Sequence, residues 1–197
     1  MKKLFFTVLL AVTSLLVKAQ TGAGSFVVGG GFDYSSTKPE NSNNTKTTNV
    51  SLEPSVGYFV IDNLSVGLNF GISSTKNTSA AGTSKTSDFY VGPFVRYYIF
   101  TSNENFAFYG QADFNISAGK TTAINGNETK SSQFDIGVRP GFSYFFNKHW
   151  ATELGFQGIR YTSYDPNTST NDDKQNTFEF GFNSLTPSSL GIRYYFK

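Results

Sequence analysis

Apolar and polar residues alternate along most of the chain. In the first such segment, Phe26, Val28, Phe32 and Tyr34 share one parity, and glycine, aspartate and serine take the other. A period of two residues predicts a β-strand with one apolar and one polar face. The alternation returns in seven further segments, at roughly residues 49–60, 64–73, 88–99, 106–117, 133–144, 150–157 and 178–196. The pattern therefore predicts eight strands.

Some segments depart from a regular pattern. The seventh loses its alternation near Ile159, and the eighth contains a polar stretch at residues 184–188. Pro54, Pro93 and Pro140 lie in the middle of predicted strands, where each removes a donor from the hydrogen-bond ladder. We therefore expect a β-bulge at each of these prolines.

The predicted connections alternate between long and short. The long ones are rich in Ser, Thr, Asn, Lys and Gly, and they cover roughly residues 36–48, 74–86, 119–131 and 162–176. The short ones are turns at roughly residues 61–63, 100–105 and 146–149. Transmembrane barrels combine short periplasmic turns with longer external loops. The lengths thus predict an all-β, eight-stranded antiparallel up-and-down barrel with both termini on the periplasmic side.

Three features indicate that the apolar face points outward to lipid. The lysines that follow residue 20 all lie in predicted loops, in turns or at the terminus, whereas a soluble barrel normally carries lysine along its outer strands. The polar face is rich in Gly and Ser, which suits a narrow interior. Aromatic residues gather at strand ends, where membrane interfaces favour them. We therefore predict a transmembrane barrel, not a soluble one with an apolar interior.

The N-terminus has the pattern of a processing signal. Lys2 and Lys3 precede an apolar run from Leu4 to Val17, and Ala19 supplies a small residue for cleavage. We expect residues 1–19 to be a cleaved signal peptide and residues 20–197 to form one barrel domain. Cleavage would leave a nearly neutral chain, so the basic balance of the precursor does not indicate nucleic-acid binding. The sequence has no cysteine, which excludes disulfides and thiol catalysis.

Three stretches carry a resemblance to a known family: Val60-Ile61-Asp62-Asn63-Leu64, Gly92-Pro93-Phe94-Val95-Arg96-Tyr97-Tyr98 and Leu190-Gly191-Ile192-Arg193-Tyr194-Tyr195-Phe196. The chain resembles the porin-like outer-membrane β-barrel domain family, similar to the small barrels of the OmpA/OmpX type without a peptidoglycan-binding domain. The resemblance implies a place in the outer membrane of a Gram-negative bacterium. It also implies insertion by the barrel-assembly machinery, which reads a C-terminal aromatic residue; here Lys197 follows Phe196.

Charged residues on the polar faces are candidates for a network inside the lumen: Glu53, Arg96, Asp113, Arg139, Glu153 and Arg193. Counted from the short turns, Arg96, Glu153 and Arg193 form a low layer, and the other three lie near the middle. An eight-stranded barrel is just wide enough for its own side chains, and buried charges need partners. We predict a plug of ion pairs in which Arg139 binds Glu53 or Asp113. A gated ion path is the alternative.

The sequence favours a structural or surface-interaction role for four polar external loops. The partners expected are outer-membrane lipid, the assembly machinery, and a surface polysaccharide or protein bound by the loops; we expect no nucleic acid. A narrow channel for ions or small solutes is the alternative, and a lipid-modifying enzyme comes third. His149 is the sole histidine, far in sequence from any Ser–Asp pair, so we expect no catalytic residue, no metal site and no cofactor.

Overall fold

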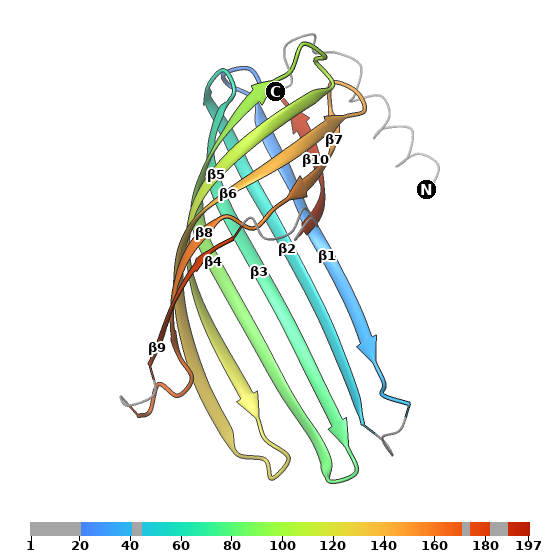
Figure 1. The fold of residues 1–197 in the computed structure, drawn as a ribbon, viewed down its shortest axis with the longest axis vertical. Coiled ribbons are helices and arrows are strands. Elements are labelled where there is room, and N and C mark those ends of the chain that lie inside the picture. Colours follow the sequence, from blue (N-terminus) through green and yellow to red (C-terminus); the bar gives the residue numbers. More distant parts are fainter. Residues whose placement is uncertain (1–20, 41–44, 171–173, 182–188) are drawn as a thin grey trace, which may run out of the picture.

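The structure is a computed structural model that describes residues 21–40, 45–170, 174–181 and 189–197. The predicted signal peptide lies outside these residues. The described residues form one curved antiparallel sheet (Figure 1). Its strands are β1 (Phe26–Thr37), β2 (Lys46–Ile61), β3 (Leu64–Ser79), β4 (Gly82–Phe100), β5 (Phe106–Thr122), β6 (Glu128–Phe145), β7 (Trp150–Gly155), β8 (Ile159–Asp165), β9 (Gln175–Phe180) and β10 (Ser189–Phe196). None of the described residues belongs to a helix that is long and apolar enough to cross a membrane.

The predicted eight-stranded antiparallel barrel is confirmed. Strands β1 to β6 pair in sequence order, β7 pairs with β6 and β10, and β10 pairs back with β1. Farther along, β8 pairs with β6 and β9 pairs with β8. Strands β7 and β8 thus share the seventh position, and β9 and β10 share the eighth. The ring is complete at the end that holds the termini. At the other end, in the described residues, Gly31–Thr37 of β1 pair with β2 alone.

The loss of alternation near Ile159 marks a β-bulge. Gly141 pairs with Gly155 and Val138 with Ile159, so three residues of the seventh strand face two of β6. The extra residue reverses which parity points outward. The sequence predicts a bulge at Pro140. The observed bulge lies opposite Pro140, but its extra residue is on the neighbouring strand and not on β6.

The bulges expected at Pro54 and Pro93 are wrong. The pairs on either side of Pro54 keep the same register, from Leu52–Ile72 to Ser55–Asn69. The same holds around Pro93. Each proline ring lies on the outer face, where it displaces no neighbouring strand. The proline removes one N–H donor from the ladder and adds no extra residue to the strand.

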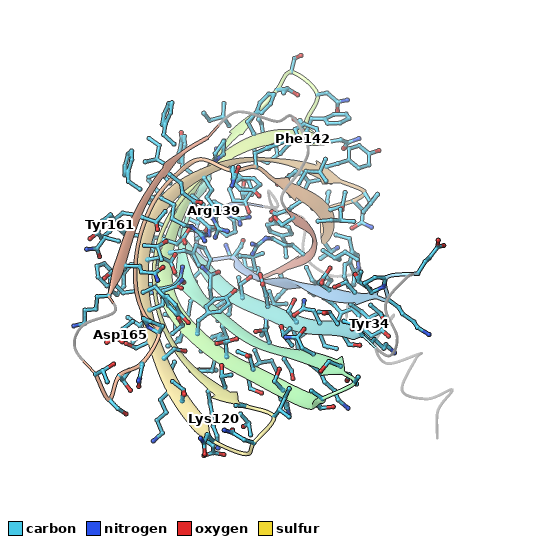
Figure 2. The ribbon with its side chains drawn as sticks, turned by 60° about the horizontal axis from the view of Figure 1, so that its bottom comes forward. Tyr34, Lys120, Arg139, Phe142, Tyr161 and Asp165 are labelled. Carbon is cyan, nitrogen blue, oxygen red and sulfur yellow. The ribbon has the colours of Figure 1, made fainter. Side chains whose placement is uncertain are left out.

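The outer and inner faces are those predicted. Val95, Phe114 and Ile136 are 46%, 41% and 52% exposed, whereas the neighbouring Arg96 and Asp113 are only 4% exposed. In the tilted view of Figure 2, Arg139 lies inside the ring, and Phe142 and Tyr161 lie outside it. The exposed apolar side chains thus form a band around the barrel, which suits lipid rather than water.

The short turns are where the sequence predicts them, but two of the long loops are not. Residues 62–63, 101–105 and 146–149 connect β2–β3, β4–β5 and β6–β7. The predicted loop 74–86 is instead a hairpin whose strands meet at Ala80–Ala81. Most of the predicted loop 119–131 is also strand, with only residues 123–127 as connection. The other two predicted loops are shortened by strands at both ends: β1 continues to Thr37, β2 begins at Lys46, β8 continues to Asp165 and β9 begins at Gln175. Residues 41–44 and 171–173 of these loops lie outside the described residues.

These two corrections have one physical reason. Beyond the membrane both faces of a hairpin meet water, so the strands need no apolar face and lose their alternation. Threonine, whose branched side chain suits a strand, keeps the pairing. The hydroxyls of Thr86 and Thr121 lie 3.1 Å apart on neighbouring strands, and those of Thr78 and Thr83 lie 3.4 Å apart. As a result, Lys46, Lys76, Lys85, Lys120 and Lys130 lie on strands and not in loops.

Candidate functional site

The inward charges are brought together by the register of the sheet. Ser65, Arg96, Gln111 and Arg139 are paired in succession across β3, β4, β5 and β6, so they form one row on the inner wall. Glu153 on β7 reaches this row from the other side of the lumen. The six predicted residues come from β2, β4, β5, β6, β7 and β10.

Glu153 is the centre of the lower layer. Its carboxylate accepts hydrogen bonds from Arg96 Nη1 at 2.6 and 2.7 Å and from Arg193 Nε at 2.5 Å. The hydroxyls of Ser143, Tyr98 and Tyr195 also donate to it, at 3.1, 3.3 and 3.4 Å. Since Glu153 is only 4% exposed, its charge depends on these donors and not on water.

Both arginines are held by further contacts. Arg96 also donates to Gln111 Oε1 from Nε and Nη2, at 2.8 and 2.6 Å. Its guanidinium carbon lies 4.0 Å from the centre of the Tyr109 ring, a cation–π contact. Arg193 Nη1 donates to the Ser55 hydroxyl at 3.0 Å. The planar, many-donor guanidinium suits such a crowded layer better than lysine would.

Buried aromatic side chains lie next to this layer on the side of the short turns. Phe59, Tyr98, Phe145 and Tyr195 are at most 1% exposed, and their rings contact one another at centroid distances of 5.3–6.2 Å. Parity already placed the two tyrosines inside. Sequence reasoning missed Phe59 and Phe145, although they share the parity of the inward residues Gly57 and Ser143.

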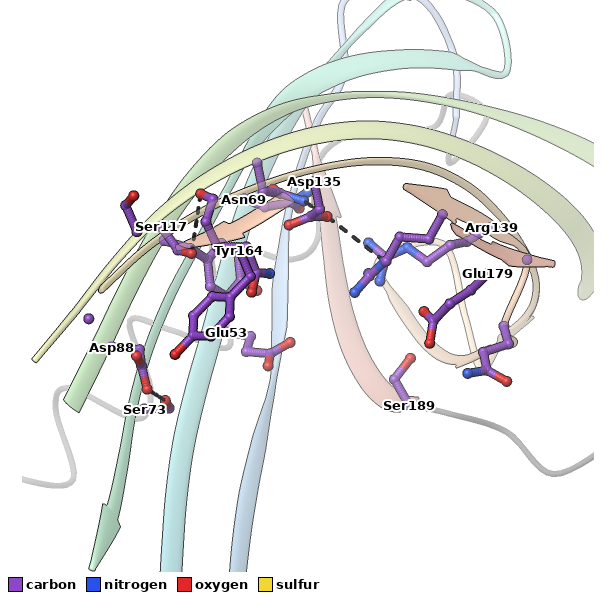
Figure 3. A pocket seen from close by; sticks show the side chains of 18 of the residues that line it. Glu53, Asn69, Ser73, Asp88, Ser117, Asp135, Arg139, Tyr164, Glu179 and Ser189 are labelled. Carbon is purple, nitrogen blue, oxygen red and sulfur yellow. Dashed lines mark hydrogen bonds and ion pairs between the residues drawn. The ribbon is translucent and has the colours of Figure 1, made fainter. Parts of the chain in front are cut away.

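The middle layer pairs Arg139 with Asp113, one of the two partners predicted for it. Arg139 Nη2 and Nε both lie 3.0 Å from Asp113 Oδ1. Asn115 donates to Asp113 at 2.8 Å and to Asp135 at 3.2 Å, and Arg160 lies 3.9 Å from Asp135. Glu53, the other predicted partner, lies apart from this pair in the wall of the cavity beyond it (Figure 3).

Sequence reasoning missed Gln111, Asn115 and Arg160. The first two are uncharged, so a search for charged residues on the polar faces does not find them. Arg160 has the parity of Leu154 and Phe156, which indicates an outward side chain. The bulge at residues 156–158 turns it inward, so the loss of alternation near Ile159 was the signal for it.

A polar cavity of about 590 Å³ occupies the half of the lumen away from the termini (Figure 3). Its wall includes Glu53, Asp88, Asp135, Arg139, Arg160 and Glu179. A smaller void of about 90 Å³ lies between Arg139 and Arg96. The lumen therefore has a hollow polar half and, below Arg96, a filled half made of the Glu153 layer and the aromatic cluster.

The described residues contain no group of three His, Cys, Asp or Glu side chains arranged to hold a metal ion. The ring of His149 stacks on Tyr194 at a centroid distance of 5.8 Å, beside the short turn. The arrangement can hold charges in place, exclude ions from the lower lumen and admit small polar solutes to the upper lumen.

Solved structures of small bacterial barrels are similar to this chain. Neisserial surface protein A is 16% identical, with 87% of this chain and 97% of that chain covered and a TM-score of 0.48. OprG of Pseudomonas aeruginosa is 16% identical, with 91% and 99% covered and a TM-score of 0.44. Ail, the attachment invasion locus protein of Yersinia pestis, is 16% identical, with 88% and 99% covered and a TM-score of 0.36.

A search of curated proteins returned no match to this sequence. A family model described as the outer membrane protein beta-barrel domain matches residues 5–184, which is most of the chain. This match agrees with the antiparallel ring, the outward apolar band and the charged interior described above. The chain therefore belongs to the outer membrane protein beta-barrel domain family, and its place is the outer membrane.

Proposed function

We propose that the protein is a non-enzymatic surface barrel that holds polar β-hairpins outside the cell for contact with surface polysaccharide or protein. The observation that carries this proposal is the length of the strands. Strands β2 to β6 have 16 to 19 residues. A tilted strand needs only about 9–11 residues to cross the membrane.

In the β3–β4 and β5–β6 hairpins, the strand residues beyond the apolar band stay paired. On β3 and β4 the ladder runs without interruption from Ile72–Phe89, at the edge of the band, to Ser79–Gly82 at the tip. Gly82 has a φ of +137°, a conformation that glycine adopts far more readily than other residues. Side chains on such a ribbon keep fixed spacings, which favours a defined contact surface over a set of mobile loops.

The orientation of the hairpins can be tested by inserting an epitope tag. A tag between Ala80 and Ala81 should be stained by antibody on intact cells, because this turn is the tip of a ribbon that stays paired from Ile72–Phe89 to Ser79–Gly82. A tag after Lys148, in the short turn opposite, should be stained only after permeabilisation. The reverse pattern would overturn the proposal, as would staining at both sites only after permeabilisation.

A narrow pore is the second candidate, and the cavity favours it. About 590 Å³ of polar space reaches down to Arg139. Ions would then have to pass Arg96, Glu153 and Arg193, which are at most 8% exposed. Because the lower lumen is filled, we rank the surface role above the pore. Measuring the single-channel conductance of the purified protein distinguishes the two.

A further inference from the structure

Lysines are placed at one fixed distance from the edge of the apolar band. On each strand from β2 to β6, a lysine lies four residues beyond the last large outward apolar side chain, on the same face. The five pairs are Val50–Lys46, Ile72–Lys76, Phe89–Lys85, Ile116–Lys120 and Phe134–Lys130. All five lysines are exposed. We call these five lysines the lysine belt.

The same spacing continues around much of the barrel. Lys38 lies four residues beyond Tyr34 of β1, and Lys174 lies four residues before Phe178 of β9. At the equivalent position on β8, four residues beyond Tyr161, the residue is Asp165. The series of lysines around the barrel is therefore interrupted at β8. On the side of the termini, the described lysines are Lys148 and Lys197, so the two rims of the barrel differ strongly in positive charge.

The sheet register sets pairs of belt lysines directly against each other. Lys76 is opposite Lys85, and Lys120 is opposite Lys130. Like charges directly opposite on neighbouring strands are unfavourable. Among the described residues, the belt has one ion pair to a carboxylate, between Lys120 and Glu128 at 2.6 Å. Anions supplied from outside the protein would relieve this repulsion.

The height of the belt indicates which anions these are. Four residues advance about 13 Å along a strand. With the usual tilt of about 35–45°, the belt lies roughly 10 Å above the apolar edge. The headgroup layer is about 5–8 Å thick on each side of the hydrocarbon core, so the backbone of the belt lies just above it. A long lysine side chain reaches back to the headgroups from this height. The intervening outward residues are small: Thr48, Ser74, Ser87, Ala118 and Ser132.

We propose that the lysine belt binds the phosphate groups of anionic glycolipid headgroups in the outer leaflet of the outer membrane. The ammonium group is a compact point charge that binds phosphate well, and its flexible stem lets it adapt to headgroups of varying position. The partner is thus a layer of phosphorylated lipid that surrounds the barrel. The inference goes beyond the proposed function and depends on it only for which leaflet the belt meets.

Binding of lipid A to the purified, folded barrel in detergent tests the proposal. Native mass spectrometry should show the unmodified protein retaining lipid A that carries two phosphates, and retaining enzymatically dephosphorylated lipid A far less. Retention should fall as salt is raised, because the lysines are exposed to screening. Equal retention of the two lipids would overturn the proposal, and this comparison needs no variant.

Variants with altered charge test whether lipid A binds at the lysine belt. The double variant Lys76→Gln/Lys85→Gln should bind phosphorylated lipid A more weakly, by roughly fivefold for each lysine removed. Lys76→Arg/Lys85→Arg should retain the binding. The control Lys148→Gln/Lys197→Gln removes two charges from the other rim and should bind like the unmodified protein. Equal losses in the two Gln variants would contradict a belt site. These measurements do not depend on orientation in the cell, so they and the epitope test fail independently.

Discussion

At the scale of single residues, the interior is filled by large and small side chains that face each other across the ladder. Tyr109 is directly opposite Gly141, and Tyr90 is directly opposite Gly71. A Cβ atom added at either glycine would collide with the tyrosine ring opposite. The glycines therefore make room for the rings, which is how a narrow lumen holds large side chains without distorting its wall.

A substitution at Gly141 tests this arrangement. Gly141→Ala should destabilise the barrel by about 1–3 kcal/mol, the usual cost of overpacking a filled interior. Gly110→Ala is the matched control, since Gly110 faces outward on β5 and a Cβ there meets no atom within 4 Å. Urea unfolding in lipid vesicles measures both. If the two variants are equally stable, the ring of Tyr109 does not require this glycine.

At the scale of the strand, one face carries the contact with lipid. On β4 the outward residues from Phe89 to Ile99 are apolar, and those from Thr83 to Ser87 are polar or charged. One strand thus crosses two environments, with its boundary between Ser87 and Phe89. The inward face of the same strand carries Arg96, so both faces are specified by alternate residues.

The cost of a charge along β4 should follow this boundary. Val95→Arg, near the middle of the apolar stretch, should cost about 2–4 kcal/mol of unfolding free energy, whereas Ser87→Arg should cost about 0–1 kcal/mol. Vesicle unfolding gives the free energies. Spin labels at the same sites add an independent readout, and quenching at position 95 by water-soluble but not lipid-soluble reagents would contradict a lipid-facing Val95.

At the scale of the whole molecule, the barrel is filled at one end and hollow at the other. The sequence-based hypothesis placed charges in two layers and named a partner only for Arg139. The structure shows that Glu153 joins Arg96 and Arg193 in the predicted low layer, and it adds the aromatic cluster below. Removal of Arg139 alone would leave that lower layer in place, so Glu153 is the better residue for testing closure.

Glu153→Gln should both weaken and open the barrel. The substitution removes the negative charge that Arg96 and Arg193 share, and breaking a buried ion pair costs about 3–5 kcal/mol. Glu128→Gln is the control, since its pair with Lys120 is half-exposed and worth at most about 1 kcal/mol.

Single-channel recording in planar bilayers measures closure. The unmodified protein and Glu128→Gln should show little conductance, and Glu153→Gln should leak. Large, steady conductance from the unmodified protein, unchanged in Glu153→Gln, would reject the plug and make the pore the first candidate function.

The sequence by itself determined the strands, their faces and the short turns. Membrane strands must alternate in polarity, so a period of two residues identifies both the strand and its lipid-facing side. The turn at Asp62–Asn63 follows from local chemistry as well, since Asn63 has a φ of 65°, which asparagine tolerates better than most residues. The inward position of Arg96, Glu153 and Arg193 followed from parity alone.

Only the tertiary structure decided which of these groups meet and where the strands end. Arg96 and Glu153 are 57 residues apart and join across the lumen, a contact set by the closure of the ring and invisible to local patterns. The bulge before Ile159 turns Arg160 inward, because one extra residue reverses parity. The hairpins outside the membrane lack an apolar face, so only their pairing with neighbouring strands distinguishes them from loops.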